Sequence, residues 1–360
     1  MSTQLSPTLV ICLSDGRGGM EHDALKLAGL LSDCCDIVLV CKNGAFIERL
    51  YNEGNYSFKC ETISFLNKSF SLSMLLKMKN ILTSHEIRNV IYFGASELKT
   101  LYFSFIGKDL NVIIRHGTTK SRPKRNWFHR LVYSCVNYHI AISKHLLANV
   151  RDIVPHGEKV KFELIYPSFS FAQYKNNPFD PGNKIKILHV GRIAHGKGHR
   201  DAILACAALY DNNFNFELFF IGDGEDEKYI DEIKNIVNHV PYKNSVRFCG
   251  YVVDVGRYME YADIFLYPSY GEGFGNVFVE AMAYSLSAVT YDNTTFPEFR
   301  KMGFKFRLVE DRNADLLAAA LLEAAKYIQS DKTEYSSNKA LAAEMFNKNR
   351  EKDAWCSIMQ

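Results

Sequence analysis

The chain has 360 residues, of which 47% are hydrophobic and 23% are charged, and its formal net charge is +3. This length allows two domain cores, and the small net charge argues against a protein that binds nucleic acid over its whole surface. The nine cysteines form no Cys-x-x-Cys pair and no zinc-binding spacing, which favours a reduced cytosol. The N-terminus lacks a basic signal-peptide region and no apolar run is long enough to span a bilayer, so we expect a cytoplasmic protein whose membrane contact would be peripheral.

Short β-rich runs alternate with helical patterns along both halves of the chain, as in parallel sheets covered by helices on both faces. The strands predicted in the first half are 9–13, 37–40, 90–93, 112–115 and 139–142. Those predicted in the second half are 185–190, 218–221, 246–249, 264–267 and 288–291. A region rich in Pro and Asn separates the halves. We predict an α/β fold with two doubly wound domains, 1–170 and 184–337, joined by a linker over 171–183 and followed by a helical segment over 338–360.

The turn after the first strand is rich in glycine and leads into a helix. Gly18 and Gly19 let the backbone approach a ligand closely. The dinucleotide-binding pattern Gly-x-Gly-x-x-Gly is absent, because Met20 and Glu21 follow directly. A ligand site and a turn without a ligand are equally compatible with this sequence.

The segment 110–151 contains no Asp or Glu but many cations and aromatic residues, and we call it the basic segment. The lack of counter-charges favours contact with an anionic acceptor or a membrane surface, while a solvated basic face and an RNA contact are alternatives. His116 ends a predicted strand and could donate to a substrate oxygen, although a structural role is the alternative. The candidate patch residues are Lys120, Arg122, Lys124, Arg125, Trp127 and Arg130.

Two cations lie five residues apart on the Gly-rich loop 191–198, directly after the strand 185–190. Arg192 offers a planar fork and Lys197 a mobile charge, so both can converge on one diphosphate. The loop is not a Walker loop, because Lys197 is followed by Gly198. The next strands end at Gly222 and Gly250, where small residues and free backbone groups could contact the same ligand.

The segment 271–283 reads as a turn followed by a helix, after a strand that Pro268 closes. Glu272 and Glu280 bracket a Gly-x-Gly turn, and Asn276 is a good N-cap type for the helix. In open parallel sheets, ligands bind at this carboxyl edge. The helix N-terminus favours a phosphate, and each carboxylate can accept hydrogen bonds from hydroxyls. Phosphate and polyol together indicate a nucleotide sugar.

These motifs together resemble the retaining GT-B glycosyltransferases of family 4. The resemblance rests on Gly191-Arg192 with Lys197, Gly222-Asp223-Gly224, Gly250-Tyr251, the Glu272 to Glu280 pair with Glu280-Ala281-Met282-Ala283, and Pro297-Glu298. Gly18-Gly19-Met20-Glu21 is similar to the N-terminal turn of that family, and the basic segment resembles lipopolysaccharide-core transferases of Gram-negative bacteria. The chain departs from the family pattern at 284–287 and 294–296, which leaves the donor sugar open.

The resemblance implies two Rossmann-like domains facing a central cleft, with the last helix returning to the first domain. It implies catalytic roles for Arg192 and Lys197 at the donor diphosphate, for Glu272 at the sugar hydroxyls and for His116 at the sugar from the other domain. It implies donor-binding roles for Gly18, Gly19, Gly222, Tyr251, Val252, Gly273, Phe274, Gly275, Asn276 and Glu280, of which Glu280 would hold the ribose. No metal or other cofactor is then required, and the sequence has no Asp-x-Asp motif.

The function that we predict is metal-independent, retaining transfer of a hexose from a UDP-sugar to a glycolipid, such as the lipopolysaccharide core. The enzyme would work at the cytoplasmic face of the inner membrane, and we expect no nucleic-acid partner. Three alternatives stay open. They are a transferase of capsule or other exopolysaccharide synthesis, a sugar-nucleotide epimerase or phosphorylase, and a non-catalytic protein that binds nucleotide sugars. The base, sugar, linkage and oligomeric state stay open as well.

Overall fold

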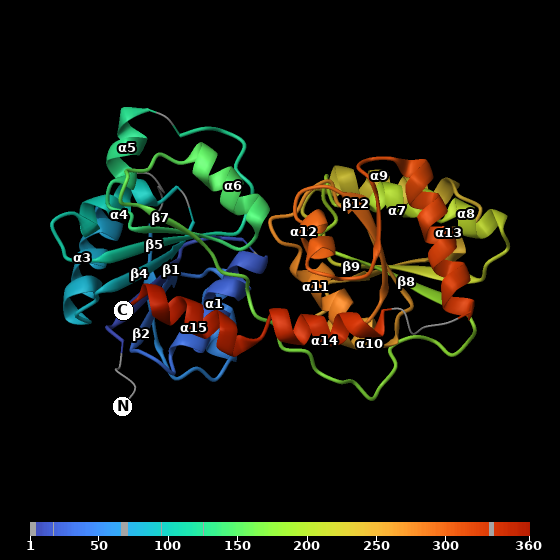
Figure 1. Cartoon of the computed structure of the whole chain (residues 1–360), viewed down its shortest axis with the longest axis horizontal. Helices are drawn as coiled ribbons and strands as arrows, with labels where there is room; N and C mark the ends of the chain where they lie inside the picture. The colour runs from blue at the N-terminus through green and yellow to red at the C-terminus, as the bar shows by residue number, and fades with distance from the viewer. Residues whose placement is uncertain (1–4, 17, 66–70, 95, 125, 331–334) are drawn as a thin grey trace. The chain divides into compact units, whose positions relative to one another are not determined.

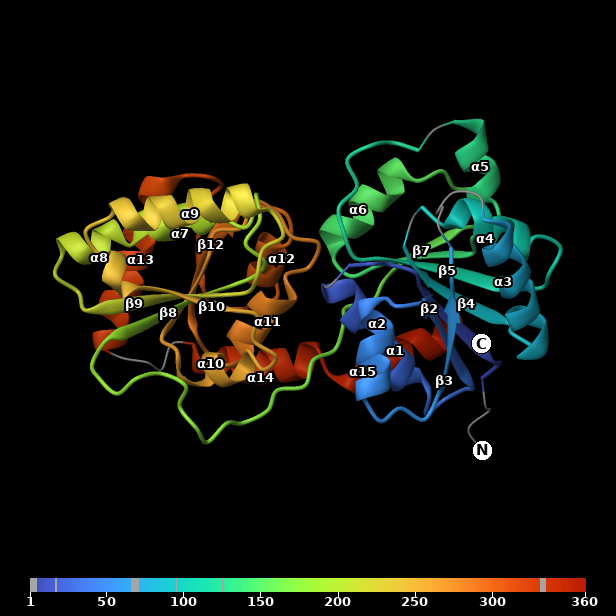
Figure 2. The same cartoon turned by 180° about the vertical axis from the view of Figure 1, so that it is seen from behind.

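A computed structural model of the chain describes residues 5–16, 18–65, 71–94, 96–124, 126–330 and 335–360. The chain divides into two compact units, each built around its own parallel sheet (Figure 1 and, from behind, Figure 2). Unit 1 comprises Met1–Ser168 and Lys348–Gln360, and unit 2 comprises Phe169–Asn347.

Unit 1 has a seven-stranded sheet of order β3-β2-β1-β4-β5-β6-β7, in which all neighbouring strands pair in parallel. This is the strand order of Rossmann-type sheets, with one further strand at the edge. The strands are β1 (Thr8–Cys12), β2 (Ile37–Lys42), β3 (Lys59–Ile63), β4 (Asn89–Phe93), β5 (Asn111–His116), β6 (Tyr138–Ala141) and β7 (Lys161–Leu164).

Helices cover both faces of this sheet, because alternate strand residues are apolar toward opposite faces. Leu9 and Ile11 of β1 pack with α3, α4 and α5, whereas Val10 and Cys12 pack with α1, α2 and α15. The helices of unit 1 are α1 (Gly19–Leu31), α2 (Phe46–Glu53), α3 (Leu72–Ser84), α4 (Leu98–Phe105), α5 (Trp127–Tyr133), α6 (Lys144–Ile153) and α15 (Lys348–Ile358).

The C-terminal helix α15 is held on unit 1 by a buried cation and two carboxylates. Arg115 donates to both carboxylate oxygens of Asp23, over 2.7 and 3.0 Å, and lies 3.6 Å from Glu351 of α15. The side chains of Arg115 and Glu351 are 1% and 0% exposed. Trp355 of the same helix is fully buried and lies beside the Arg115 guanidinium. Without the Glu351 charge, Arg115 would keep only its bidentate bond to Asp23.

Unit 2 has a six-stranded parallel sheet of order β10-β9-β8-β11-β12-β13. Its strands are β8 (Ile185–Val190), β9 (Phe216–Ile221), β10 (Val246–Gly250), β11 (Ile264–Tyr267), β12 (Ser287–Asp292) and β13 (Arg307–Glu310). Its helices are α7 (His199–Ala205), α8 (Ala207–Asp211), α9 (Glu227–His239), α10 (Gly256–Tyr261), α11 (Asn276–Ala283), α12 (Phe296–Lys301), α13 (Ala314–Ser330) and α14 (Ser336–Met345), with a 3₁₀ turn η1 (Lys243–Ser245).

The two faces of this second sheet are filled differently. One face packs aliphatic residues against α7, α8, α9 and α13. On the other face, phenylalanines from α11, α12 and the chain around them pack together: Phe278 is stacked on Phe299, and Phe299 packs edge to face on Phe346. Phe274 belongs to this cluster, with ring centroids 5.2 Å from Phe299 and 5.6 Å from Phe346. The cluster therefore fixes the turn that leads into α11.

The two doubly wound α/β sheets are confirmed, and the structure adds three strands to the ten predicted. These are β3, β7 and β13, which are edge strands with mostly polar or half-exposed residues. They lack the continuous apolar runs that mark the central strands of parallel sheets. The helical segment predicted over 338–360 consists of two helices, because the chain leaves the helix at Phe346 and Asn347; α14 belongs to unit 2 and α15 to unit 1.

The segment predicted as the linker contains no helix or strand, and it packs on unit 2 from Phe169 onward. Its backbone accepts hydrogen bonds from two tyrosines: Tyr284 donates to the carbonyl of Ala172 over 2.9 Å, and Tyr261 to that of Tyr174 over 2.6 Å. Tyr174 in turn donates to Asp254 over 2.5 Å. Hydrogen bonds therefore hold this segment against α10 and the C-terminal end of α11.

Candidate active site

The loops that follow β8, β9 and β10 meet at the carboxyl edge of the unit 2 sheet, where backbone packs directly on backbone. The amide of Gly191 donates to the carbonyl of Ile221 over 2.9 Å, and the amide of Gly222 to that of Gly250 over 2.8 Å. A Cβ atom at residue 222 would lie only 2.3 Å from the Gly191 carbonyl oxygen, and the φ of Gly222 is +136°. Glycine is therefore required there for close packing of the two loops.

The loop that carries Lys197 is fixed to the chain after β11. Gly198 has a φ of +74°, and a Cβ atom there would lie 2.0 Å from the carbonyl oxygen of Pro268. On the other side, Nε2 of buried His189 donates to the carbonyl of Lys197 over 2.8 Å. Burial lowers the pKa of His189 to about 4, so the ring is neutral at pH 7 and Nε2 carries its proton. These contacts bring Lys197 to the segment that contains Glu272.

Glu272 is the centre of a hydrogen-bond cluster at this edge. Its Oε1 atom lies 2.6 Å from the Lys197 ammonium, 2.6 Å from the Tyr267 hydroxyl and 2.7 Å from the Ser269 hydroxyl. The side chain of Glu272 is 12% exposed and that of Lys197 is 24% exposed. Among the described residues, the hydrogen bonds to this carboxylate all end on Oε1. Oε2 is therefore the oxygen that can accept from a ligand.

The donors around Glu272 are held in a fixed protonation state and position. Burial, together with the Glu272 charge, raises the pKa of Tyr267 well above its ordinary value, so this hydroxyl remains a donor at neutral pH. The backbone amide of Glu272 donates to the Thr294 hydroxyl over 3.0 Å. Sequence reasoning assigned roles to Lys197 and Glu272 but missed Tyr267, Ser269 and Thr294. An apolar strand end followed by Pro and Ser gave no chemical signal for them.

The helix α11 starts where the sequence predicted, but its N-cap is a different residue. Gly275, with a φ of +83°, is the N-cap, and Asn276 is the first helical residue. The N-cap prediction for Asn276 is therefore wrong, because the turn needs the left-handed conformation that glycine adopts most easily. The Phe274 side chain is 2% exposed in the aromatic cluster, so only its backbone could meet a ligand, alongside that of Gly273. Glu280 is half-buried in the second turn of α11.

The other predicted donor residues of unit 2 present their side chains to solvent. Arg192 is exposed, and within the described chain its side chain forms no hydrogen bond or ion pair. Tyr251 is 58% exposed and Val252 half-buried, directly after the β10 end at Gly250. Arg192, Tyr251 and Val252 thus lie on loops at the same sheet edge as Lys197. Whether they bind a donor stays a prediction.

The glycine turn of unit 1 already faces an anionic group of the protein itself. Gly18 is the N-cap of α1, which begins at Gly19, and the Gly18 amide donates to Oε2 of Glu21 over 2.9 Å. Glu21 is 2% exposed. In this structure the amide that we expected to meet a ligand is therefore satisfied by an internal carboxylate.

His116 lies at the carboxyl end of β5, as the sequence predicted, but its side chain is only 2% exposed. Its Nε2 atom lies 2.9 Å from Nδ1 of His139, which is also buried. Burial and the neighbouring His139 lower the pKa of His116 well below its ordinary value, and burial lowers that of His139 to about 3. The pair is therefore neutral at pH 7, and contact of His116 with a donor sugar stays a prediction.

Part of the basic segment is held by a hydrogen bond to α6, and another part is exposed to solvent. The amide of Lys120 donates to the Asn149 side chain of α6 over 2.8 Å, while Arg122, Arg130 and Trp127 are exposed, Trp127 by 75%. Arg125 lies outside the described residues. Across the described chain, the structure contains no helix with both the length and the apolar character needed to cross a membrane.

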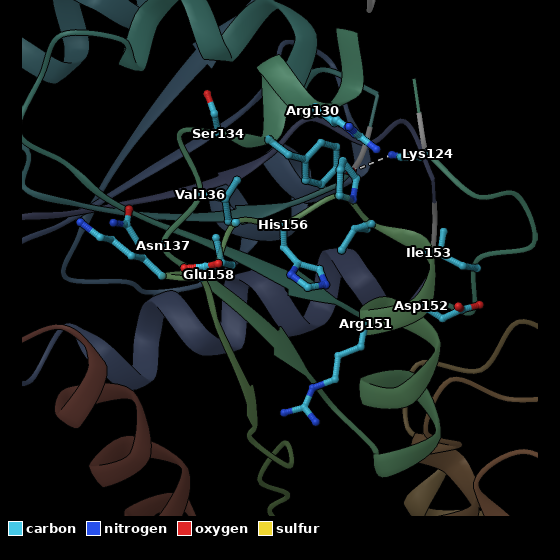
Figure 3. Close-up of a pocket in the computed structure, with 16 residues that line it drawn as sticks. Lys124, Arg130, Ser134, Val136, Asn137, Arg151, Asp152, Ile153, His156 and Glu158 are labelled. Carbon is cyan, nitrogen blue, oxygen red and sulfur yellow. Dashed lines mark hydrogen bonds between the residues drawn. The ribbon is translucent and has the colours of Figure 1, made fainter. Parts of the chain in front are cut away.

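A pocket of about 810 Å³ lies in unit 1, next to part of the basic segment (Figure 3). Lys124 and Arg130, two of the predicted patch residues, line it. The rest of its lining comes from the end of α5, the loop before β6, the end of α6 and the loop before β7, and includes Arg151, His156 and Lys159. Sequence reasoning did not assign this cavity, because residues distant in sequence form it.

Comparison with known proteins places unit 2 in a family. Residues 170–338 match the family model described as glycosyl transferases group 1. The amylovoran biosynthesis glycosyltransferase AmsK of Erwinia amylovora is 32% identical over 146 residues, which cover 38% of this chain and 35% of that protein. The 4-alpha-N-acetylgalactosaminyltransferase of Campylobacter jejuni that acts on a diphospho-undecaprenol-linked sugar is 23% identical over 310 residues, covering 79% of this chain and 80% of the relative.

Solved structures match over the full chain at low identity, which supports the fold. HepE of Anabaena, solved in complex with UDP and glucose, aligns with a TM-score of 0.82 and 18% identity over 98% of each chain. The lipopolysaccharide outer core galactosyltransferase WaaB aligns with a TM-score of 0.70 and 16% identity over 98% of each chain.

The sequence matches are partial, and three relatives, AmsK, CapJ and a monoglucosyldiacylglycerol synthase, are matched over 35%, 27% and 41% of their length. The family match coincides with the unit that contains the Lys197–Glu272 cluster. The chain thus has the GT-B fold, and residues 170–338 form a domain of the glycosyl transferases group 1 family.

Proposed function

We propose that this protein is a retaining glycosyltransferase that moves a hexose from a UDP-sugar to a glycolipid acceptor. The observation that carries the proposal is the meeting of Lys197 and Glu272 at the carboxyl edge of a glycosyl transferases group 1 domain. A cation suited to phosphate and a carboxylate suited to sugar hydroxyls lie 2.6 Å apart there. The exposed Arg192 and the start of α11 lie on loops at the same edge.

The cations of this site would stabilise the leaving group. Breaking the anomeric bond leaves negative charge on the diphosphate, and preorganised donors at that position lower the barrier. Losing one such donor costs roughly 2.7–4 kcal/mol, or about a hundredfold to a thousandfold in rate. Because an ammonium has three donor hydrogens, Lys197 can keep its bond to Glu272 while donating to a phosphate oxygen. Arg192 and Lys197 would supply the positive charge, so we propose that no metal is needed.

Glu272 would position the sugar rather than attack it. Three donors surround Oε1, which leaves Oε2 to accept a hydrogen bond from a sugar hydroxyl. The departing phosphate itself would take the acceptor proton on the face that it leaves, which retains the anomeric configuration. Glu280, one turn into α11, would accept from the ribose hydroxyls, and Tyr251 and Val252 would flank the base.

The acceptor would be an anionic glycolipid, and we propose the lipopolysaccharide core, reached at the cytoplasmic face of the inner membrane. The exposed cations and Trp127 of the basic segment support contact with such a molecule. Synthesis of an exopolysaccharide is the second candidate, because the relatives include glycosyltransferases named for amylovoran and colanic acid biosynthesis.

The experiment is a UDP-release assay with UDP-glucose, UDP-galactose and UDP-N-acetylglucosamine, each with and without lipopolysaccharide-core acceptor and with and without EDTA. We expect release that depends on the acceptor and resists EDTA. Lys197→Met should lower its rate at least about a hundredfold, and Glu280→Gln should raise the KM for the UDP-sugar. Full activity in both variants would contradict the residue roles. Conversion of the UDP-sugar without an acceptor would instead indicate an epimerase, and tight UDP binding without turnover a non-catalytic protein.

A further inference from the structure

The pocket in unit 1, here called the basic pocket, has an excess of positive charge. Lys124, Arg130, Arg151 and Lys159 line it, against the two acids Asp152 and Glu158. Within the described part of the chain, none of the four cations takes part in an ion pair. Figure 3 shows His156 near the middle of the lining, with Lys124 and Arg130 on one side and Arg151 on the other. Around a space of about 810 Å³, the four lining cations thus outnumber the two lining acids.

The innermost of these cations is held in place by the protein. The backbone amide of Lys124 donates to the carbonyl of Ile153 at the end of α6, over 3.0 Å. Its ammonium donates to the hydroxyl of buried Tyr133 over 2.7 Å. Burial, together with the charges of Lys120 and Lys99, lowers the pKa of Lys124 to about 8. A bound anion would offset this cost by pairing with the ammonium.

Aromatic rings also lie at the wall of the basic pocket. The His156 ring packs edge to face on Phe162, with centroids 4.9 Å apart, and the Arg151 guanidinium lies over the same Phe162 ring at 5.6 Å. This stacking limits the motion of Arg151, so less side-chain entropy is lost when it binds a ligand. A planar fork held on a ring is suited to the oxygens of a phosphoryl group, and the half-buried Lys124 ammonium lines the same pocket.

The basic pocket is separate from the edge of unit 1 that carries His116. Asn137 and Val160 of its lining directly precede β6 and β7, so the pocket lies at the amino ends of these strands. His116 ends β5 at the opposite, carboxyl edge. The predicted donor contacts of unit 1 therefore do not account for the pocket.

We propose that the basic pocket binds a phosphoryl group of the glycolipid acceptor, with Lys124, Arg130, Arg151 and Lys159 as its ligands. The proposal rests on the proposed function for the identity of the molecule that carries the phosphate. The binding of the phosphoryl group itself does not depend on that function. The site would hold the acceptor through a charged group that takes no part in the transfer.

The test is calorimetric titration of the full-length protein with inorganic pyrophosphate at pH 7, in the presence of saturating UDP so that the proposed donor site does not bind the probe. We expect binding that weakens about tenfold or more in Arg151→Gln and in Lys159→Gln, which remove cations from two different elements. Lys79→Gln is the matched control, because Lys79 is an exposed lysine on α3 of the same unit and does not line the pocket. Thermal unfolding monitored by circular dichroism checks that each variant is folded.

The acceptor arm uses the UDP-release assay with intact and with dephosphorylated lipopolysaccharide-core acceptor. We expect Arg151→Gln to raise the KM for the intact acceptor and to leave the KM for the dephosphorylated one nearly unchanged. Absence of pyrophosphate binding to the wild type, or equal binding by all three variants, would overturn the phosphoryl site while leaving the proposed function standing. Pyrophosphate binding that needs Arg151, in a protein that never releases UDP, would support the site and refute the function. If Arg151→Gln raised the KM for the intact and for the dephosphorylated acceptor equally, the link between the basic pocket and the acceptor phosphate would be refuted.

Discussion

The Lys197–Glu272 pair should be measurably coupled in the protein without ligand. A double-mutant cycle of Lys197→Met, Glu272→Gln and the double variant isolates the charge interaction. Methionine keeps most of the aliphatic stem of Lys197. Glutamine keeps an oxygen that can accept from Tyr267 and Ser269, which lie 2.6 and 2.7 Å from Oε1. The cycle therefore changes the charges and little else.

The expected coupling follows from the exposure of the pair. With 24% and 12% exposed side chains and a separation of 2.6 Å, the pair lies between a surface ion pair and a buried one. Surface pairs contribute about 0–1 kcal/mol, and hydrogen bonds to charged groups contribute about 1.5–3 kcal/mol. We expect a coupling free energy of about 1.5–3 kcal/mol in the stability of unit 2.

The assay is urea unfolding with two optical signals. Both tryptophans, Trp127 and Trp355, belong to unit 1, so fluorescence reports unit 1. Far-UV circular dichroism reports both units, and the transition that fluorescence does not detect belongs to unit 2. A coupling free energy below about 0.5 kcal/mol, which is the usual error of additivity, would refute the pairing that the donor site requires.

Three further predictions concern stability. Gly198→Ala should destabilise unit 2 by about 3 kcal/mol or more, because of its φ of +74° and the backbone oxygen 2.0 Å from the new Cβ, as measured by the urea midpoint in circular dichroism. Glu351→Gln should destabilise unit 1 by about 1–3 kcal/mol, because buried Arg115 loses one of its two charge partners and keeps Asp23, as measured by tryptophan fluorescence. Burial lowers the pKa of His189 to about 4 and that of His199 to about 2, so acid should destabilise unit 2, as measured by urea unfolding between pH 7 and pH 5.

The sign of the acid effect follows from the two protonation states. In the unfolded chain a histidine titrates near pH 6.5, whereas His189 and His199 stay neutral in the folded unit well below that pH. The stability that the two neutral histidines contribute is therefore fully present above about pH 6.5. On acidification below that pH, the free energy of unfolding of unit 2 falls by roughly 1.4 kcal/mol per pH unit for each histidine. A free energy of unfolding of unit 2 that is constant between pH 7 and pH 5 would contradict this predicted acid effect. The control for Gly198→Ala is Gly196→Ala, which has a similar φ of +86° but no described atom within 4 Å of the new Cβ. The control for Glu351→Gln is Asp353→Asn, at an exposed residue of the same helix. Both controls should cost less than the substitutions that they match.

Sequence patterns located the sheets because their central strands are buried on both faces. Runs such as 185–190 consist of buried residues, and their short length separates them from the helices. Edge strands such as β13, whose four residues are half-buried or exposed, lack this signal. Their position follows from pairing with β12, which only the folded sheet supplies.

The candidate site was predictable where its chemistry is carried by unusual residue types. Lys197 and Glu272 were identified from cations and carboxylates beside glycines. Their direct contact was not, because 75 residues separate them and the contact depends on packing of Gly198 against the chain after β11. His116 illustrates the opposite case: the position at a strand end was correct, but the neighbouring strand supplies His139, which pairs with it and buries it.

The most direct test of the proposed function is mass spectrometry of the acceptor after incubation with the wild-type protein and each UDP-sugar. We predict that the wild-type protein adds one hexose unit from one UDP-sugar to a glycolipid acceptor, in a 1:1 ratio to released UDP, and that the Lys197→Met variant does not. A protein that binds UDP but leaves every glycolipid and polysaccharide acceptor unchanged, with all three UDP-sugars intact, would contradict it.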